Sequence, residues 1–299
     1  MSDAISLRHV AYRPAKEFAI RDLNMTVPTG AIYGFLGPNG SGKSTTIKLL
    51  LGMQVAAEGT IEVLGHAIPQ SAPQALARIG YVPEKPHLYP SLTVGEMIAH
   101  HGVFYASWDA ARAEELRRQF ALRNEQRIER LSKGETGKLM MLLALSTQPD
   151  LLVLDEPTDG LDPVVRRDVL AALVDYVSSR NATVLVSSHL VHEQERICDW
   201  VGVMDDGALV AEMPMHAFRS GIKRLRVRNA PPVLPAAPFT MLGRTPITDR
   251  DEEWGVRNWQ PAMASWIAEQ GAELREITDL DLEESFVELL STARSGGAA

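Results

Sequence analysis

Disulfide partners, long apolar runs and an excess of basic residues are all missing from this sequence. Its one cysteine, Cys198, cannot form an internal disulfide and suits a reducing compartment. The longest apolar run, Leu139–Leu145, is far shorter than the roughly 20 residues that a membrane-spanning helix needs. The first residues also lack the apolar core of a signal peptide. We therefore expect the chain by itself to be soluble and to remain in the cytoplasm.

The charge balance excludes another class of protein. Lys and Arg number 30 against 38 Asp and Glu, which gives a net charge of −8. A protein whose main task is to grip bare nucleic acid usually carries a basic footprint, so we expect no nucleic-acid partner. A length of 299 residues predicts two domains at roughly 150 residues each. The hydrophobic share of 45% is ordinary for a globular protein.

Strand-like and helix-like segments alternate along the first two thirds of the chain. Two segments near the N-terminus alternate polar and apolar residues with period two, as half-buried strands do. Three later segments are mainly apolar, as in strands covered on both faces. Helix-forming residues dominate between about 91 and 146. This order predicts an α/β fold with a mostly parallel sheet. The five strand segments are Ile5–Val10, Leu23–Val27, Ala31–Leu36, Leu151–Leu154 and Thr183–Ser187.

A glycine-rich loop follows the first mainly apolar strand and leads into a helical stretch. It matches the pattern G-x-x-x-x-G-K-[ST] in full, in the strand-loop-helix context that this motif requires. Glycines let the backbone amides approach phosphate oxygens at a helix N-terminus. Lys43 supplies a positive charge to the β- and γ-phosphates, and Ser44 supplies a hydroxyl to Mg²⁺. The predicted phosphate-binding residues are Gly37, Pro38, Asn39, Gly40, Ser41, Gly42, Lys43, Ser44 and Thr45.

Acidic residues and a histidine follow two other buried strands. Asp155 and Glu156 end the strand that begins at Leu151, and His189 follows the strand that begins at Thr183. In an open α/β sheet these strand ends lie near the phosphate loop. Asp155 then holds Mg²⁺, Glu156 orients and deprotonates the attacking water, and His189 hydrogen-bonds the phosphate and the water. Solvated acids at a strand end are common, so this prediction depends on the loop beside them.

With these motifs in place, Leu131-Ser-Lys-Gly-Glu135 resembles the Leu-Ser-Gly-Gly-Gln signature of the ATP-binding cassette (ABC) family. The resemblance covers roughly residues 3–220. It implies that Ser132 and the Gly134 amide contact the γ-phosphate of ATP bound to the opposite subunit, and that Glu135 belongs to the same nucleotide-binding set. Lys133 and Glu135 depart from the commonest pattern.

Further positions match the family one at a time. Glu84 stands where the family usually has Gln, and the resemblance implies that it contributes to the Mg²⁺ site and to catalysis. Asp162 matches an acid in the loop that crosses the dimer interface, and His189 matches the switch histidine. Tyr12 lies near the position where the family stacks an aromatic ring on adenine, or it is an ordinary strand residue. Glu156, His189 and Glu84 are the implied catalytic residues, and Ser44, Asp155 and Glu84 the implied metal ligands.

The resemblance also implies the subdomain organisation, the partners and the cellular location of the protein. The fold is a P-loop NTPase with an antiparallel β subdomain and a helical subdomain at about 91–146, all within residues 1–220. Beyond the resemblance, a composition shift near residue 229 predicts a small separate α/β accessory unit over residues 221–290, followed by a flexible tail over 291–299. The ATPase, using ATP and Mg²⁺, pairs head to tail with a second cassette, identical or not. It drives a separate membrane permease from the inner face of the membrane. The prediction of export comes from two segments that resemble the ATPase subunits of two-component bacterial exporters, Phe104–Asp109 and Asp279–Glu288.

Three questions stay open at this point. A soluble cassette of translation or DNA repair remains possible, although such proteins usually carry two cassettes or long insertions. A non-catalytic regulatory cassette is disfavoured by the intact Lys43, Asp155, Glu156 and His189. In the accessory unit the tryptophans form either a core or a partner surface, and burial in a core is favoured. These tryptophans are Trp254, Trp259 and Trp266.

Overall fold

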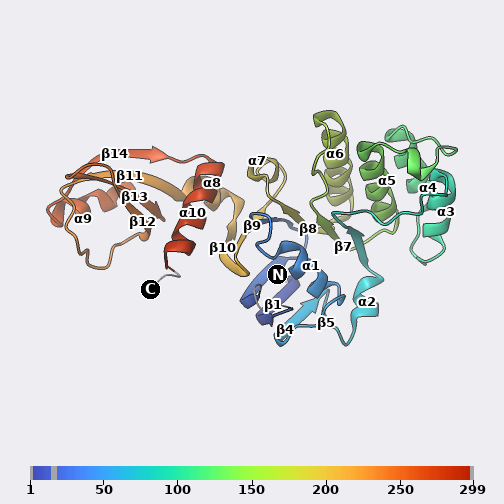
Figure 1. The fold of residues 1–299 in the computed structure, drawn as a ribbon, viewed down its shortest axis with the longest axis horizontal. Helices are drawn as coiled ribbons and strands as arrows, with labels where there is room; N and C mark the ends of the chain where they lie inside the picture. The colour runs from blue at the N-terminus through green and yellow to red at the C-terminus, as the bar shows by residue number, and fades with distance from the viewer. Residues whose placement is uncertain (1–2, 15–18, 297–299) are drawn as a thin grey trace.

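The computed structural model describes residues 3–14 and 19–296, which form three β-sheets surrounded by helices (Figure 1). One antiparallel sheet, in the order β2-β1-β4-β5, comprises β1 (Asp3–Tyr12), β2 (Ile20–Pro28), β4 (Glu58–Val63) and β5 (His66–Ile68). The central sheet, in the order β10-β9-β3-β8-β7-β6, comprises β3 (Ile32–Leu36), β6 (Ile79–Val82), β7 (Leu151–Asp155), β8 (Thr183–Ser188), β9 (Trp200–Asp205) and β10 (Ala208–Pro214). The third sheet, in the order β12-β13-β11-β14, comprises β11 (Ile222–Arg228), β12 (Thr240–Pro246), β13 (Asp251–Arg257) and β14 (Glu273–Asp279). The helices are α1 (Lys43–Leu50), α2 (Ala72–Leu76), α3 (Val94–Gly102), α4 (Ala110–Gln119), α5 (Lys133–Ser146), α6 (Pro163–Arg180), α7 (Val191–Gln194), α8 (Met215–Gly221), α9 (Ala264–Glu269) and α10 (Leu282–Gly296), with short 3-10 helices at Ile128–Arg130 and Pro261–Met263.

The central sheet gathers the functional strand ends at one edge. Strand β3 pairs in parallel with β8 and β9, and β7 pairs in parallel with β6 and β8. Every side chain of β3, β7 and β8 is buried, as expected for strands covered on both faces. Leu36 lies opposite Ser188 and Asp155 opposite Ser187. The segments that follow β3, β7 and β8 therefore begin side by side.

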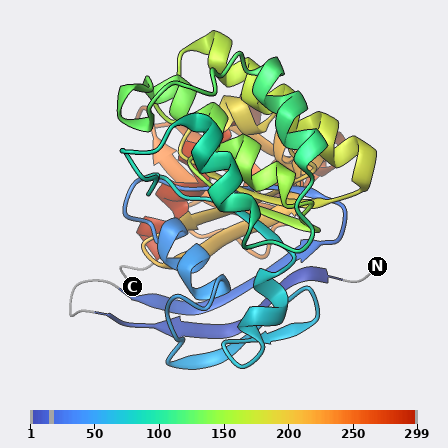
Figure 2. The same cartoon turned by 90° about the vertical axis from the view of Figure 1, so that its right-hand side faces the viewer.

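The antiparallel sheet and the helices cover opposite sides of the central layer. Figure 2 shows the strands β1, β2, β4 and β5 at the bottom and the helices from α3 to α6 above. Helices α3, α4 and α5 lie inside the range 91–146 that was expected to be helical, and side chains such as Met97, Leu116 and Leu139 bury them in the main core. Among the residues described, no helix is both long enough and apolar enough to cross a bilayer.

The third sheet forms a small unit with a core of its own. Strands β11 and β13 contribute Leu225 and Trp254, which are fully buried, and α9 contributes Ile267. Trp259 is also buried, and Trp266 packs against this core from its edge, with its ring edge-on to Phe239. The interpretation of these tryptophans as core residues is therefore confirmed.

Helix α10 differs from the expected end of the chain. We predicted a helix ending at 290 and a flexible tail over 291–299, but α10 runs from Leu282 to Gly296. Residues 297–299 lie outside the described part of the chain. Leu282 and Leu289 are buried in the main core beside Phe218 of α8, because apolar residues recur at helical spacing along α10. The helix therefore connects the accessory unit to the nucleotide-binding part, and the unit is less separate than predicted.

Candidate functional site

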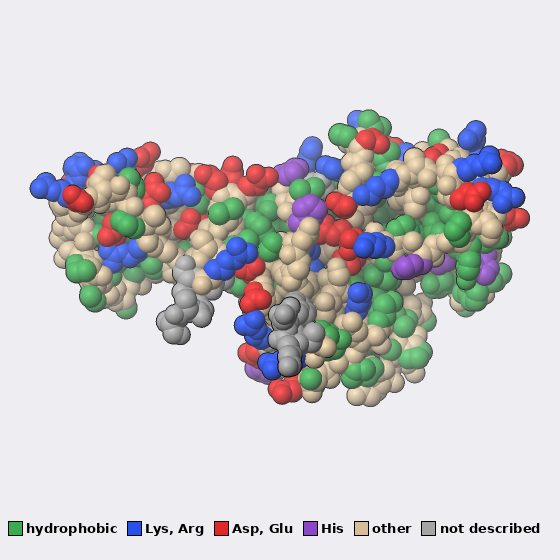
Figure 3. Space-filling view, in the orientation of Figure 1, with side chains coloured by type: hydrophobic (Ala, Val, Ile, Leu, Met, Phe, Trp, Pro, Cys, Tyr) green, Lys and Arg blue, Asp and Glu red, His purple; other side chains and the backbone are tan. Residues whose placement is uncertain are grey.

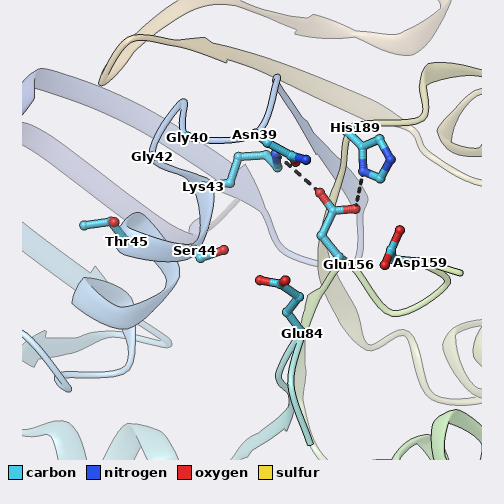
Figure 4. A pocket seen from close by; sticks show the side chains of 10 residues that line it. All are labelled: Asn39, Gly40, Gly42, Lys43, Ser44, Thr45, Glu84, Glu156, Asp159 and His189. Atoms are coloured by element: carbon cyan, nitrogen blue, oxygen red, sulfur yellow. Dashed lines mark hydrogen bonds and ion pairs between the residues drawn. The ribbon is translucent and has the colours of Figure 1, made fainter. Parts of the chain in front are cut away.

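A cavity of about 480 Å³ opens at the ends of β3, β7 and β8 (Figure 4). It brings together residues from four places in the sequence that the motifs had singled out. It also includes Asp159, which sequence analysis missed although it lies next to the predicted interface loop Gly160–Asp162. The lining residues are Asn39, Gly40, Gly42, Lys43, Ser44, Thr45, Glu84, Glu156, Asp159 and His189.

The phosphate loop has the backbone that its glycines allow. Gly40 and Gly42 have φ of 84° and 114°, in the left-handed region that side chains disfavour. A Cβ on Gly37 would lie 2.4 Å from the carbonyl oxygen of Met204, so the loop passes against β9 too closely for any other residue. Gly42 caps α1 without a side-chain hydrogen bond, so the first amides of the helix are available to an anion. Ser41 Oγ is buried and has no hydrogen-bond partner among the described residues.

Lys43 is nearly buried, with 5% of its side chain exposed. Its Nζ donates to the carbonyl oxygen of Gly37 at 2.7 Å and lies 3.3 Å from Oε1 of Glu156. The ammonium group is thus held at the wall of the cavity, in contact with a carboxylate from the neighbouring strand end.

Glu156 contacts charged or polar groups on both of its oxygens. Its Oε1 faces Lys43, and its Oε2 accepts a hydrogen bond from Nδ1 of His189 at 2.9 Å. Its backbone amide donates to Ser187 Oγ at 3.0 Å, which fixes the residue to β8. Glu156 also has a positive φ of 49°, a strained conformation of the kind that is often retained at functional sites. Figure 4 shows Lys43, Glu156 and His189 pointing toward one another.

Oxygen ligands gather on the other side of the cavity. Ser44 Oγ donates to Oδ1 of Asp155 at 3.1 Å, and Ser187 Oγ donates to the same oxygen at 2.7 Å. Glu84, just after β6, lies across from Ser44 (Figure 4). Burial first, and then the charges of Asp155 and Glu84, raise the pKa of Tyr81 to about 12. The two carboxylates therefore add negative charge beside Tyr81 and Ser44.

The signature residues lie at the start of α5 and do not line this cavity. Ser132 is the N-cap of α5, and its Oγ accepts from the amide of Glu135 at 3.2 Å while the Glu135 carboxylate accepts from the Ser132 amide at 2.9 Å. Lys133 Nζ forms an ion pair with Asp159 Oδ2 at 3.2 Å. Ser132 and Glu135 thus form a reciprocal capping box at the start of this helix.

Asp162 and Tyr12 also lie outside the cavity lining, as do Gly37, Pro38 and Ser41 of the phosphate loop. Asp162 is the N-cap of α6, and its Oδ1 accepts from the amides of Val164 and Val165. Tyr12 ends β1 and packs against the core beneath the antiparallel sheet, just before residues 15–18, which lie outside the described part of the chain. Its stacking on adenine stays a prediction.

The chain is similar to several known proteins over most of its length. A family model described as "ABC transporter" matches residues 20–159. The Nod factor export ATP-binding protein I of Cupriavidus metallidurans is 36% identical over 221 residues, which cover 72% of this chain and 73% of the relative. The bacitracin transport ATP-binding protein BcrA of Bacillus licheniformis is 33% identical over 221 residues, covering 73% of this chain and 72% of the relative.

Solved structures show the same fold. A structure described as the ATP-binding subunit of an ABC transporter aligns with a TM-score of 0.65 and 28% identity, covering 72% of this chain and 92% of that chain. The nucleotide-binding α/β fold predicted from the sequence is therefore confirmed.

Proposed function

The chain belongs to the ABC transporter family as an ATP-binding, ATP-hydrolysing subunit, and on this premise we propose roles for its residues, a mode of assembly and a membrane partner. The family predicted from the sequence is confirmed, as is the prediction of a transport ATPase. The observation that carries the proposal is the contact of Lys43, Glu156 and His189 in a single cavity.

We assign the hydrolytic roles by what each side chain can do in that cavity. The start of α1 and Lys43 bind the β- and γ-phosphates of ATP, with the glycine-rich loop wrapped around them. Glu156 accepts the proton of the attacking water. His189 holds the Glu156 carboxylate in place through Nδ1, which leaves the rest of the imidazole facing the cavity. Phosphoryl transfer depends mostly on positioning and charge, which these contacts supply.

The oxygen donors opposite Lys43 fit Mg²⁺. A hydroxyl from Ser44 and carboxylates from Asp155 and Glu84 are the hard ligands that this ion prefers. No group of three or more acidic, histidine or cysteine side chains able to hold a metal gathers among residues 3–14 and 19–296. Protein sites for Mg²⁺ usually supply one or two carboxylates and leave the remaining positions to phosphates and water. When bound here, the ion would neutralise charge on the phosphates.

We propose that the complete site forms between two chains. Ser132, Gly134 and Glu135 cap α5 outside the cavity of their own chain, and Asp162 caps α6 outside it too. The α5 start is a helix N-terminus, which attracts anions. A head-to-tail pair places this start of one chain against the phosphates bound by the other. The partner is a second copy or a related cassette.

Mixing two inactive variants tests this assembly. Lys43→Ala removes the positive charge that binds the phosphates. Ser132→Asp keeps a good helix N-cap but places a negative charge against the γ-phosphate. Each variant alone is expected to lose ATPase activity. A mixture is expected to recover part of it, because one of the two sites in a mixed dimer combines an intact loop with an intact Ser132. Absence of any recovery, in a mixture shown to form dimers, would contradict the composite site.

We further propose that a membrane subunit contacts the side of the chain between α2, α3 and α5. A mainly apolar cavity of about 350 Å³ lies there, lined in part by Met53, Leu88 and Tyr105. Large apolar side chains are exposed nearby, including Val103 at 78% and Phe104 at 69%. Figure 3 shows hydrophobic side chains beside histidines at the right of the molecule. Exposed apolar patches of this kind are typical of protein-protein contacts.

Export is the proposed direction of transport. The relatives are named for Nod factor export and bacitracin transport, and the proposal takes the direction from them but not the substrate. With its membrane contacts made through the partner, the chain would work at the inner face of the membrane.

A further inference from the structure

The last helix of the accessory unit ends against the nucleotide-binding part of the chain. Arg294 of α10 donates from Nε to Oδ2 of Asp205 at 2.8 Å and from Nη2 to Oδ1 at 3.0 Å. Asp205 ends β9, in the hairpin that leads to β10, and only 7% of its side chain is exposed. The guanidinium therefore forms a two-pronged contact with a nearly buried carboxylate that lies 89 residues earlier in the sequence.

The hairpin that contains Asp205 also supports the phosphate loop. The amide of Gly207 donates to the carbonyl oxygen of Ser41 at 2.9 Å, and the carbonyl of Gly207 accepts from the amide of Arg21 at 2.9 Å. One residue before Asp205, the carbonyl of Met204 lies so close to Gly37 that a Cβ there would be at 2.4 Å. The end of β9 and the turn that follows it thus contact the loop that binds phosphate at Gly37 and at Ser41.

We propose that Arg294 is a positioning residue for ATP binding, which links the C-terminal accessory unit to the phosphate loop through Asp205. This inference rests on the proposed function of that loop. Arg294 neutralises the carboxylate of Asp205 and holds the end of β9, whose neighbouring residues Met204 and Gly207 contact the phosphate loop. Without Arg294 the nearly buried charge of Asp205 is uncompensated, and the β9–β10 turn is free to shift.

The contact differs from an ordinary surface ion pair, which contributes little. Asp205 is nearly buried and both of its carboxylate oxygens accept from Arg294, whose own side chain is 63% exposed. Removing one partner of such a pair leaves a buried charge without compensation, which is far more costly than losing an exposed pair. Asp206 adds a second negative charge, and it pairs with Arg21 at 2.7 Å.

Variants of the full-length chain test the link through ATP affinity. Arg294→Gln is expected to raise both the KM for ATP and the Kd for a fluorescent ATP analogue by roughly three- to tenfold, measured with MgCl₂ present. This is the size of the interaction energies measured between residues of one ion-pair network. The kcat should change little, because no group touching the reacting atoms is altered. Arg294→Lys, which keeps the charge, should restore part of the affinity. Asp205→Asn combined with Arg294→Gln should bind ATP better than Arg294→Gln alone, because both charges are then absent.

A matched control uses another arginine of the same unit. Arg275 pairs with Glu273 at 2.8 Å on the exposed edge strand β14, so Arg275→Gln should leave KM and kcat unchanged. Thermal melting of each variant checks that it is folded at the assay temperature. If Arg294→Gln is unfolded at that temperature, Arg294→Lys is used in its place to test the link. The KM of Arg294→Lys is expected to lie between those of the wild type and Arg294→Gln.

Two outcomes separate this inference from the proposed function. If Lys43→Ala loses ATP binding while Arg294→Gln (or a deciding Arg294→Lys) keeps the wild-type KM and Kd, the link through Asp205 is wrong and the phosphate site stands. If Lys43→Ala binds ATP like the wild type, the proposed function of the loop itself is wrong. A fall in kcat with unchanged KM would also overturn the positioning role.

Discussion

Lys43 Nζ lies 3.3 Å from Glu156 Oε1, and both side chains are almost buried in the wall of the cavity beside the phosphate loop. The two residues come from different strand ends, β3 with its loop and β7. Their opposite charges stabilise each other where neither has much water around it. In the proposed mechanism, a phosphate bound by the loop competes with Glu156 for Lys43, and the carboxylate then faces the attacking water while His189 still contacts its other oxygen. We therefore propose that the contact between Lys43 and Glu156 links ATP binding to activation of the base.

Glu156→Gln tests the assignment of the base. Gln keeps the shape of the side chain but cannot accept a proton, so ATP hydrolysis is expected to fall by roughly 10²–10⁴. ATP binding should persist, because the loop and Lys43 are intact. Phosphate release measures the rate, and equilibrium binding of a fluorescent ATP analogue measures the affinity. Glu115→Gln, at an exposed ion pair on α4, is the matched control and should hydrolyse ATP normally. Wild-type turnover in Glu156→Gln would exclude Glu156 as the base.

The mostly parallel sheet and the charged residues at the ends of its buried strands could be predicted from the sequence. Buried strands such as Leu151–Leu154 are fully apolar, and parallel strands place their carboxyl ends at one edge, so Asp155 and Glu156 had to lie near Lys43 once the loop was found. Asp159, which also lines the cavity, was not predicted. Its position depends on the conformation of the turn after β7, which no recognised sequence pattern indicates.

The end of the chain could not be predicted for a related reason. The pattern of charges and small residues after 290 is typical of a frayed tail, and nothing near Arg294 in the sequence indicates a partner. Its partner Asp205 becomes a neighbour only when α10 packs against α8 and β10. Contacts between residues so far apart follow from tertiary packing, which local patterns do not encode.

Ser44→Ala tests the proposed Mg²⁺ site. The variant loses a hydroxyl that lies 3.1 Å from Asp155 Oδ1, so the Mg²⁺ concentration for half-maximal ATPase activity should rise by roughly tenfold or more. Chelating the ion with excess EDTA should abolish activity in the wild type as well. Ser179→Ala, on the exposed side of α6, is the control. An unchanged Mg²⁺ requirement in Ser44→Ala would remove Ser44 from the metal site.

Phe104→Ser tests the proposed contact with a membrane subunit. The side chain is 69% exposed, so its loss should change the free energy of unfolding by no more than about 0.5 kcal/mol. The variant is expected to hydrolyse ATP normally in isolation and to be recovered less in the membrane fraction of its host. Val233→Ser, at an 81% exposed position of the accessory unit, serves as the control. Equal membrane recovery of both variants and the wild type would argue against this surface.

Cys198 gives a test of the packing behind β3, because it is the chain's one thiol. Its side chain is buried, its Sγ donates to Gln194 Oε1 at 3.0 Å, and burial raises the pKa of the thiol well above its usual value. The thiolate is the form that reacts with iodoacetamide, and each unit by which the pKa rises lowers the thiolate fraction about tenfold. At pH 8, iodoacetamide should therefore label the folded protein more than about tenfold slower than the protein in denaturant. The raised pKa also means that stability is full below the pKa of the unfolded thiol and falls as the pH rises past it. Ser220→Cys adds an exposed thiol on α8, which should label rapidly in the folded state. Rapid labelling of wild-type protein at pH 8 would show that the packing around Cys198 is open.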